Sequence, residues 1–249
     1  MSANSSWAAR NCCLASLLRW RRRSHSARSP TPPPGTPSSP ACRRSVSRAG
    51  PGQPLRDLAA DSAYVSSVLD TITGPVILVG HSYGGAVLTN AARGHADIKA
   101  LVYLAAFAPD QGESAYQLTG QFPGSKLSES ILARPYPGGV DGYVDPAKFR
   151  DVFAADLPAS QARVLAAAQR PANVAGLQGP SGAPAWKDIP SWFLIAGADH
   201  TIPPTAQRFM AKRAGSHTVE LRRSSHLVML SNPDAATALI LAAHTATRA

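Results

Sequence analysis

Residues 75–85 read PVILVGHSYGG, and this stretch decides the fold. Its first six residues form a continuous apolar run, which is typical of a strand buried on both faces of a parallel sheet. The motif G-x-S-x-G follows at residues 80–84, and small residues then continue as a predicted helix to about Arg93. So sharp a turn strains the backbone of Ser82, and the flanking glycines give it room. We predict that the serine oxygen stands above the sheet edge at a helix N-terminus, where negative charge is favoured; the alternative is a packing turn with an idle serine.

Helical and strand patterns alternate along the rest of the chain from Leu55 onward. Beyond the strand and helix above, the sequence predicts a helix over 58–72, strands over 100–105, 192–196 and 218–221, and helices over 203–214 and 233–244. Such alternation is typical of an α/β fold with a mostly parallel sheet flanked by helices. The carboxyl ends of the strands then lie at one edge, where ligands bind.

The net charge of +10 comes from the first 54 residues. They hold nine arginines, eleven serines, eight prolines and no acidic residue, whereas residues 55–249 hold 16 Lys or Arg against 15 Asp or Glu. We predict that residues 1–54 are a disordered tail, because they bury too little apolar surface to offset the entropy of ordering. Residues 55–249 then form one domain, long enough for its own core.

The tail permits three interpretations. Its run WRRR at residues 20–23 can attract nucleic acid or an anionic membrane, but no aromatic or helical pattern supports that role, and we expect no nucleic-acid partner. Its Arg- and Ser-rich composition also resembles an organellar transit peptide. The third interpretation, that it is not the native N-terminus, depends on the family resemblance below. Because no stretch approaches ~18 apolar residues, we expect no membrane span, and we expect a cytoplasmic protein unless the tail directs it to an organelle.

A base and an acid are needed to activate a serine hydroxyl. Among the seven histidines, His226 lies between the last predicted strand and the last helix, at the ligand-binding edge, and His200 is its main rival. Asp199 follows the strand at 192–196 through a two-residue turn, so it reaches the same edge, and Asp110 is the fallback acid. The order Ser82, Asp199, His226 is the chain order of α/β hydrolases.

From Leu55 to the C-terminus the sequence resembles α/β-hydrolase-fold serine hydrolases, in particular small bacterial esterases related to plant methylesterases and hydroxynitrile lyases. The resemblance rests on residues 80–85, 106–109 (AFAP), 195–204 and 225–226. It implies Ser82 as nucleophile, Asp199 as acid, His226 as base, and the backbone N–H of Tyr83 as an oxyanion donor. No metal or organic cofactor is implied.

The resemblance also implies a mostly helical cap over the site, at about residues 110–187. Aromatic residues of the cap and its surroundings are then candidate walls of the substrate pocket. These candidates are His81, Phe107, Phe122, Tyr136, Tyr143, Phe149, Phe153 and Trp186.

The sequence departs from this family before Leu55. The family opens with strands and a His-Gly loop that supplies a second oxyanion donor, and nothing similar precedes Leu55. Loss of one donor typically lowers turnover by ~10²–10³-fold. The departure predicts that the first strands are missing and that residues 76–79 form an unpaired apolar edge. We therefore hypothesise that residues 1–54 result from a frameshift or a misplaced start.

The function expected from these residues is hydrolysis of a small carboxylic ester through an acyl-enzyme. Dehalogenase and epoxide chemistry need a carboxylate where Ser82 stands. Leu227 occupies the position where hydroxynitrile lyases have a lysine, which favours ester hydrolysis over cyanohydrin cleavage. The alternative is a catalytically impaired or silent homologue that binds a small ligand.

Overall fold

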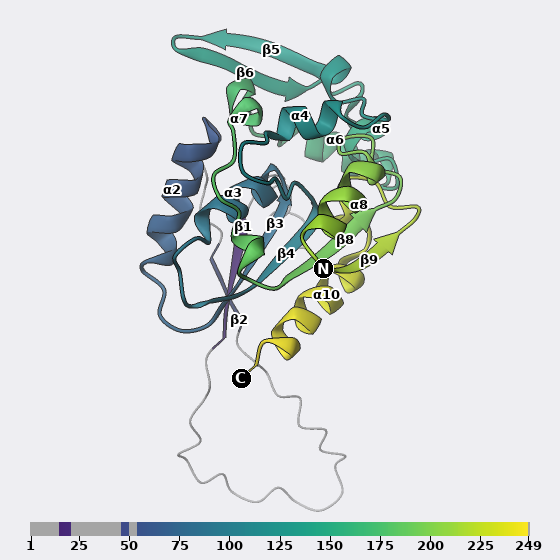
Figure 1. Cartoon of the computed structure of the whole chain (residues 1–249). Coiled ribbons are helices and arrows are strands. Elements are labelled where there is room, and N and C mark those ends of the chain that lie inside the picture. The colour runs from purple at the N-terminus through teal and green to yellow at the C-terminus, as the bar shows by residue number, and fades with distance from the viewer. Residues whose placement is uncertain (1–14, 21–45, 50–53, 249) are drawn as a thin grey trace, which may run out of the picture.

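The computed structural model describes residues 15–20, 46–49 and 54–248, which form a central sheet with helices on both faces and a cap above it (Figure 1). The order of the strands in the central sheet is β2-β1-β3-β4-β8-β9. The parallel strands are β3 (Val76–Ser82), β4 (Ile98–Ala106), β8 (Ser191–Ala196) and β9 (His217–Leu221). The strands predicted from the sequence are therefore present, each within about two residues of its expected bounds.

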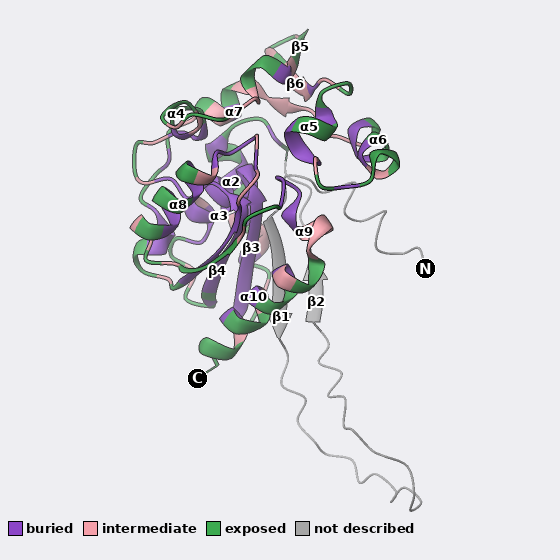
Figure 2. Cartoon of the chain, turned by 90° about the vertical axis from the view of Figure 1, so that its right-hand side faces the viewer, coloured by how far each residue is buried: buried purple, intermediate pink, exposed green. Residues whose placement is uncertain are grey.

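Alternate residues of β3 enter two different cores, as expected for a strand covered on both faces. Val76 and Leu78 pack with α2 (Leu58–Leu69), α3 (Tyr83–Ala91) and α8 (Pro204–Arg213). Ile77 and Val79 pack on the opposite face with α9 (Val228–Ser231) and α10 (Pro233–Ala246). Figure 2 shows the buried sheet between these two layers. Within the described part of the chain, no helix combines the length and the apolar character that a membrane crossing requires.

The strand β3 is paired on both sides, so the prediction of an unpaired edge at residues 76–79 is wrong. β1 (Ala15–Trp20) runs antiparallel to it, with Ala15 opposite Gly80 and Arg19 opposite Val76. β2 (Val46–Ala49) in turn pairs with β1. The physical reason is that the free N–H and C=O groups of a buried strand require partners, and the short apolar sequence within residues 15–20 provides a strand for them.

The two added strands also correct the prediction that residues 1–54 lack regular structure throughout. Residues 15–20 and 46–49 belong to the central sheet. The rest of the predicted tail, including the three cysteines and most of the WRRR run, lies outside the described residues. The division into a tail and a hydrolase domain remains a prediction.

The cap is the chain between β4 and β8, and it is less helical than the sequence predicts. It contains a three-stranded antiparallel sheet in the order β5-β6-β7, because residues 131–144 form a hairpin around Gly138. Its strands are β5 (Ile131–Tyr136), β6 (Gly139–Val144) and β7 (Ala172–Asn173). Its helices are α4 (Ala115–Gly120), α5 (Phe149–Phe153), α6 (Ala159–Ala167) and α7 (Val174–Gln178), with 3-10 turns at Ser128–Ser130 and Ala185–Lys187.

Helix α3 approaches β4 very closely at Gly85. A Cβ atom built on Gly85 would lie 2.3 Å from the backbone oxygen of Phe107 and 2.7 Å from the Cβ of Ala106. No side chain fits there without moving the backbone of one of the two elements. The glycine therefore sets the position of α3, and with it the position of Ser82 at the start of that helix.

We expect Gly85→Ala to lower the free energy of unfolding by about 3 kcal/mol, because the added methyl group meets backbone atoms rather than a flexible side chain. The matched control is Gly120→Ala in α4, where nothing lies within 4 Å of the added Cβ. Urea unfolding followed by circular dichroism compares the two variants. Equal stability of both variants would show that the contact with Phe107 is not tight.

Candidate active site

Ser82 is the last residue of β3 and the N-cap of α3, as the glycine-flanked motif predicts. Its φ of 54° and ψ of −127° are values that residues other than glycine rarely adopt. The turn is possible because Gly80 has no side chain, since a Cβ there would lie 2.4 Å from Leu88 and 2.6 Å from the Gly84 oxygen. The strained turn thus directs the Ser82 hydroxyl away from the strand at the carboxyl edge of the sheet.

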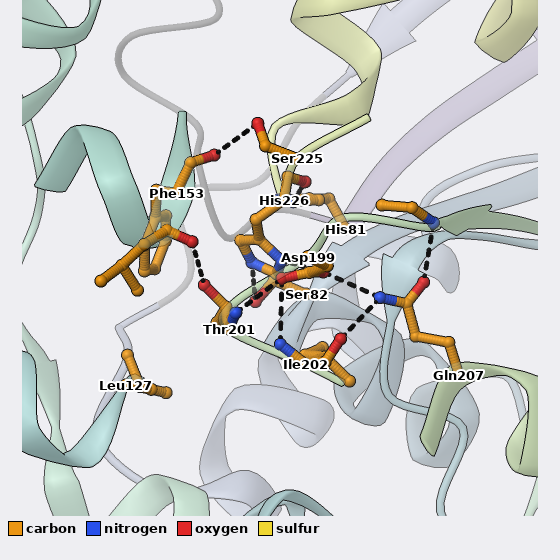
Figure 3. A network of polar contacts seen from close by, with 12 residues as sticks. His81, Ser82, Leu127, Phe153, Asp199, Thr201, Ile202, Gln207, Ser225 and His226 are labelled. Carbon is orange, nitrogen blue, oxygen red and sulfur yellow. Dashed lines mark hydrogen bonds and ion pairs between the residues drawn. The ribbon is translucent and has the colours of Figure 1, made fainter. Parts of the chain in front are cut away.

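The structure brings Ser82, His226 and Asp199 together in one hydrogen-bonded chain (Figure 3). The Nε2 atom of His226 lies 2.9 Å from Ser82 Oγ, and its Nδ1 atom lies 2.8 Å from Asp199 Oδ2. Because a carboxylate only accepts hydrogen bonds, Nδ1 carries the proton and Nε2 is left to accept one from the serine. All three side chains are buried, with His226 0% exposed. The arrangement can move a proton from Ser82 to His226.

Both oxygens of Asp199 are fully hydrogen-bonded. Oδ1 accepts from the backbone N–H groups of Thr201 (2.7 Å) and Ile202 (3.1 Å). Oδ2 accepts from the Nε2 of Gln207 (2.8 Å) as well as from His226. A buried carboxylate needs such partners, because burial without them is costly. Together they fix the orientation in which Asp199 faces the imidazole.

Gln207 is a functional neighbour that the sequence analysis missed. It is fully buried on α8, where its amide also bonds the Ala196 N–H (3.0 Å) and the Ile202 oxygen (2.8 Å). The sequence does contain a signal for Gln207: it is a polar residue on the same face of the predicted helix as the apolar residues Ala206 and Met210. That signal indicates a buried polar group but not its partner, since the partner follows from how α8 packs on β8.

Two of the candidate pocket residues contact His226. The ring of His81 lies 4.6 Å from the His226 ring, and its Nε2 lies 3.0 Å from the His226 backbone oxygen, which can only accept. The ring of Phe153 meets His226 edge-on at 4.8 Å, and Phe149 stacks on Phe153 at 5.3 Å. The His226 ring is therefore packed between the rings of two aromatic side chains, His81 and Phe153.

The other candidate pocket residues make contacts elsewhere, and their role as pocket walls stays a prediction. Phe107 is buried in the main core, and its backbone N–H donates to the backbone oxygen of Ser82 (3.1 Å). Phe122 contacts Phe209, and Tyr143 lies beside Arg134. Tyr136 accepts a hydrogen bond from Asn173 and faces Arg56, whereas Trp186 donates to the Pro109 oxygen and faces Arg213.

The rival base and the fallback acid are engaged outside this hydrogen-bonded chain. The Nδ1 of His200 donates to the backbone oxygen of Asp151 in the cap, at 2.9 Å. Asp110 forms an ion pair with Lys187 at 2.6 Å, and this contact holds the pKa of the Asp110 carboxyl below its usual value. The geometry therefore favours His226 and Asp199 over these alternatives.

Tyr83 begins α3, so its N–H belongs to the first turn, whose N–H groups do not bond within the helix. The Tyr83 hydroxyl donates to Asp61 Oδ2 at 3.0 Å. Asp61 is fully buried on α2, and its Oδ1 accepts from the N–H of Leu55 at 2.9 Å. Burial raises the pKa of Asp61, and the hydrogen bond from Tyr83 opposes that rise. Asp61 is a second site neighbour that the sequence analysis did not select.

The described residues include no group of three or more His, Cys, Asp or Glu side chains placed to hold a metal ion.

The chain belongs to the alpha/beta hydrolase family, whose model matches residues 5–239. A curated relative, alpha/beta hydrolase nvfD of Aspergillus novofumigatus (strain IBT 16806), is 31% identical over 169 residues. The match covers 64% of this chain and 66% of the relative, so the chain spans just under two thirds of the length of that protein. Membership of this family supports hydrolase chemistry.

Solved structures of esterases and other hydrolases have the same fold. Polyneuridine aldehyde esterase superposes with a TM-score of 0.63 at 18% identity, covering 75% of this chain and 79% of that one. Methylesterase MES16 from Arabidopsis gives 0.61 at 21% identity, covering 76% and 78%. The pyrethroid hydrolase PytH gives 0.59 at 24% identity, covering 77% and 80%. At these identities the likeness establishes the fold.

We expect Gln207→Met to lower the free energy of unfolding by about 3 kcal/mol. The change leaves the buried Ala196 N–H and one oxygen of Asp199 each short of a hydrogen bond, and such groups cost ~1–3 kcal/mol each. Gln161→Met on α6 makes the same chemical change at a partly exposed position and is the control, with an expected change below ~0.5 kcal/mol. Urea unfolding measures both, and a Gln207→Met variant as stable as the control would contradict the assignment.

We expect Tyr83→Phe to destabilise the protein by about 2 kcal/mol at pH 8, because a hydrogen bond to a charged carboxylate is lost. The variant raises the pKa of Asp61 further, since the lost bond favoured the charged form. The destabilisation is therefore complete above the folded-state pKa of Asp61 and shrinks as the pH falls through it. Urea unfolding between pH 8 and pH 4, with Tyr64→Phe at an exposed position as control, tests this. A loss that is constant with pH would assign it to packing alone.

Proposed function

We propose that this protein hydrolyses a small carboxylic ester through a covalent acyl-enzyme. In this proposal Ser82 is the nucleophile, His226 the general base and then general acid, and Asp199 the group that orients the imidazole. The observation that carries the proposal is the continuous hydrogen-bonded chain from Ser82 Oγ through His226 to Asp199, at 2.9 and 2.8 Å. Family membership and the esterase fold of the neighbours support it.

The first half of the proposed reaction forms the acyl-enzyme. His226 Nε2 takes the hydroxyl proton while Ser82 Oγ attacks the ester carbonyl carbon. Asp199 stabilises the imidazolium through Nδ1–H, and the backbone N–H of Tyr83 donates to the oxyanion. The tetrahedral intermediate then collapses, the ester C–O bond breaks, and His226 gives its proton to the departing alcohol oxygen.

The second half releases the acid. A water molecule transfers a proton to His226 Nε2 and attacks the acyl carbon, and collapse of the second intermediate returns the proton to Ser82. The surroundings of the base favour this chemistry over cyanohydrin cleavage. Leu227, directly after the base, is fully buried among apolar cap residues, so no cation stands at that position.

We expect the full chain to hydrolyse p-nitrophenyl acetate, and Ser82→Ala to lower kcat by roughly 10³-fold or more. Each oxyanion donor typically contributes ~10²–10³-fold to turnover, so the measured kcat also reports on the donors available beside Tyr83. Release of p-nitrophenol is followed by absorbance, over a panel of acetate to octanoate esters.

The matched control for this experiment is Ser191→Ala. Ser191 is a buried serine at the amino end of β8, the end opposite to the site, where it bonds Ser216. We expect this variant to retain the parent's kcat. Equal rates for the parent and Ser82→Ala would remove the enzymatic proposal and favour the silent homologue.

A further inference from the structure

The carboxyl end of the cap helix α5 contacts the loops on both sides of the proposed triad. The last carbonyl groups of any α-helix have no partner within the helix. In α5 these are the oxygens of Asp151, Val152 and Phe153. All three accept hydrogen bonds from the two loops that follow β8 and β9, at distances of 2.9 to 3.3 Å.

On the acid side the connecting residue is Thr201. Its hydroxyl donates to the Val152 oxygen at 3.0 Å, while its backbone N–H donates to Asp199 Oδ1 at 2.7 Å. Thr201 is 1% exposed, so solvent does not compete for these bonds. One residue therefore links the cap helix directly to the carboxylate that orients His226.

On the base side the two neighbours of His226 in the chain are both bound to the cap. The Leu227 N–H donates to the Phe153 oxygen at 3.0 Å, and the Ser225 hydroxyl donates to the same oxygen at 3.3 Å. The backbone N–H of Ser225 also donates to Asp156 at 3.1 Å, and its hydroxyl contacts that carboxylate as well. Figure 3 shows Phe153 beside His226, with the dashed contact from Ser225.

The two loops also touch each other, through the Ala198 N–H and the Ser224 oxygen at 2.9 Å. This bond joins the loops next to Asp199 and shortly before His226. The contacts with α5 are made by Thr201, two residues after Asp199, and by Ser225 and Leu227 on either side of His226. The bond at Ala198 therefore brings the loops together, while α5 fixes the orientation of the portions that carry the acid and the base.

We propose that α5 fixes the relative position of two loops: the acid loop, which follows β8 and carries Asp199, and the base loop, which follows β9 and carries His226. Thr201 and Ser225 are then positioning residues for the triad. The inference rests on the proposed function and deepens it, because it makes part of the cap a component of the catalytic arrangement. Neither residue touches the reacting atoms. Each acts through Asp199 or His226, so their loss affects the chemical step rather than substrate binding.

The experiment compares kcat and KM for p-nitrophenyl acetate in Thr201→Val and Ser225→Ala. We expect each variant to lower kcat about tenfold with KM changed less than twofold, because small displacements of catalytic groups reduce turnover strongly. Thr201→Ser restores the hydroxyl, and we expect it to recover most of kcat. The matched controls are Thr119→Val in α4 and Ser191→Ala in β8, which make the same chemical changes at hydrogen-bonded residues away from both loops and are expected to leave kcat unchanged.

A third variant changes an exposed residue of the cap instead of a residue within the two buried loops. Asp156 is exposed, and Asp156→Ala removes the acceptor of the buried Ser225 N–H without changing any residue of the two loops. We expect about a threefold loss of kcat. Proton NMR gives an independent readout in all variants, because displacement of Asp199 or His226 weakens the downfield resonance of the Nδ1–H that joins them.

The outcomes separate this inference from the proposed function. If Ser82→Ala abolishes activity while Thr201→Val, Ser225→Ala and Asp156→Ala keep the parent's kcat and resonance, α5 is not a positioning element and the esterase proposal stands. If Ser82→Ala keeps activity, the proposed function fails. The resonance then still reports whether α5 orients the pair of Asp199 and His226.

Discussion

The carboxylate of Asp199 is the group on which the candidate site most depends. It is buried, and its four hydrogen bonds come from three parts of the structure: two consecutive N–H groups of its own loop, a side chain of α8 and the imidazole. A buried carboxylate tolerates few arrangements, because every unmet bond is costly in a medium of low dielectric. The orientation of the imidazole is thereby set by the packing of α8 on β8. The geometry that joins Ser82, His226 and Asp199 therefore depends on the packing of the fold and not on these three residues alone.

The second constraint is the backbone at Ser82, and it is met by residues without side chains. The strained torsion angles of Ser82 persist because Gly80 and Gly85 let β3, α3 and β4 approach within contact distance. The strain is offset by the burial of apolar side chains on both faces of the sheet. Ser82 is thus fixed by contacts in the core, while the loops that carry Asp199 and His226 are hydrogen-bonded to α5 of the cap.

The strained turn at Ser82 and the hydrogen bonds of Asp199 differ in how well they can be predicted from the sequence. The turn at Ser82 and the order of strands and helices could be predicted, because apolar runs and glycines at fixed spacing have local meanings. The placement of Asp199 and His226 followed from the rule that loops after parallel strands meet at one edge. Gln207 and Asp61 were missed, because a buried polar side chain is recognised only when its partner across the fold is known.

The departures from prediction have the same physical origin. The pairing of residues 15–20 with β3 depends on a contact between segments about sixty residues apart, and composition argued only for disorder. In the cap, the short strands at 131–144 contain proline, glycine and charged residues, which weaken a strand pattern. Only the pairing of the two strands around Gly138 makes them a sheet.

The hairpin of β5 and β6 has a consequence for how this protein can diverge. Half of its residues are exposed, including Leu132 at 51%, and Arg56 contacts it from the start of α2 through Asp141 and the Tyr136 ring. Two hairpin residues, Ile131 and Val144, pack against α5 and Leu227, whereas the solvent-facing positions between them contact neither α5 nor the glycines below Ser82. The solvent-facing positions of this hairpin are therefore where the sequence can change with least effect on the contacts around Ser82.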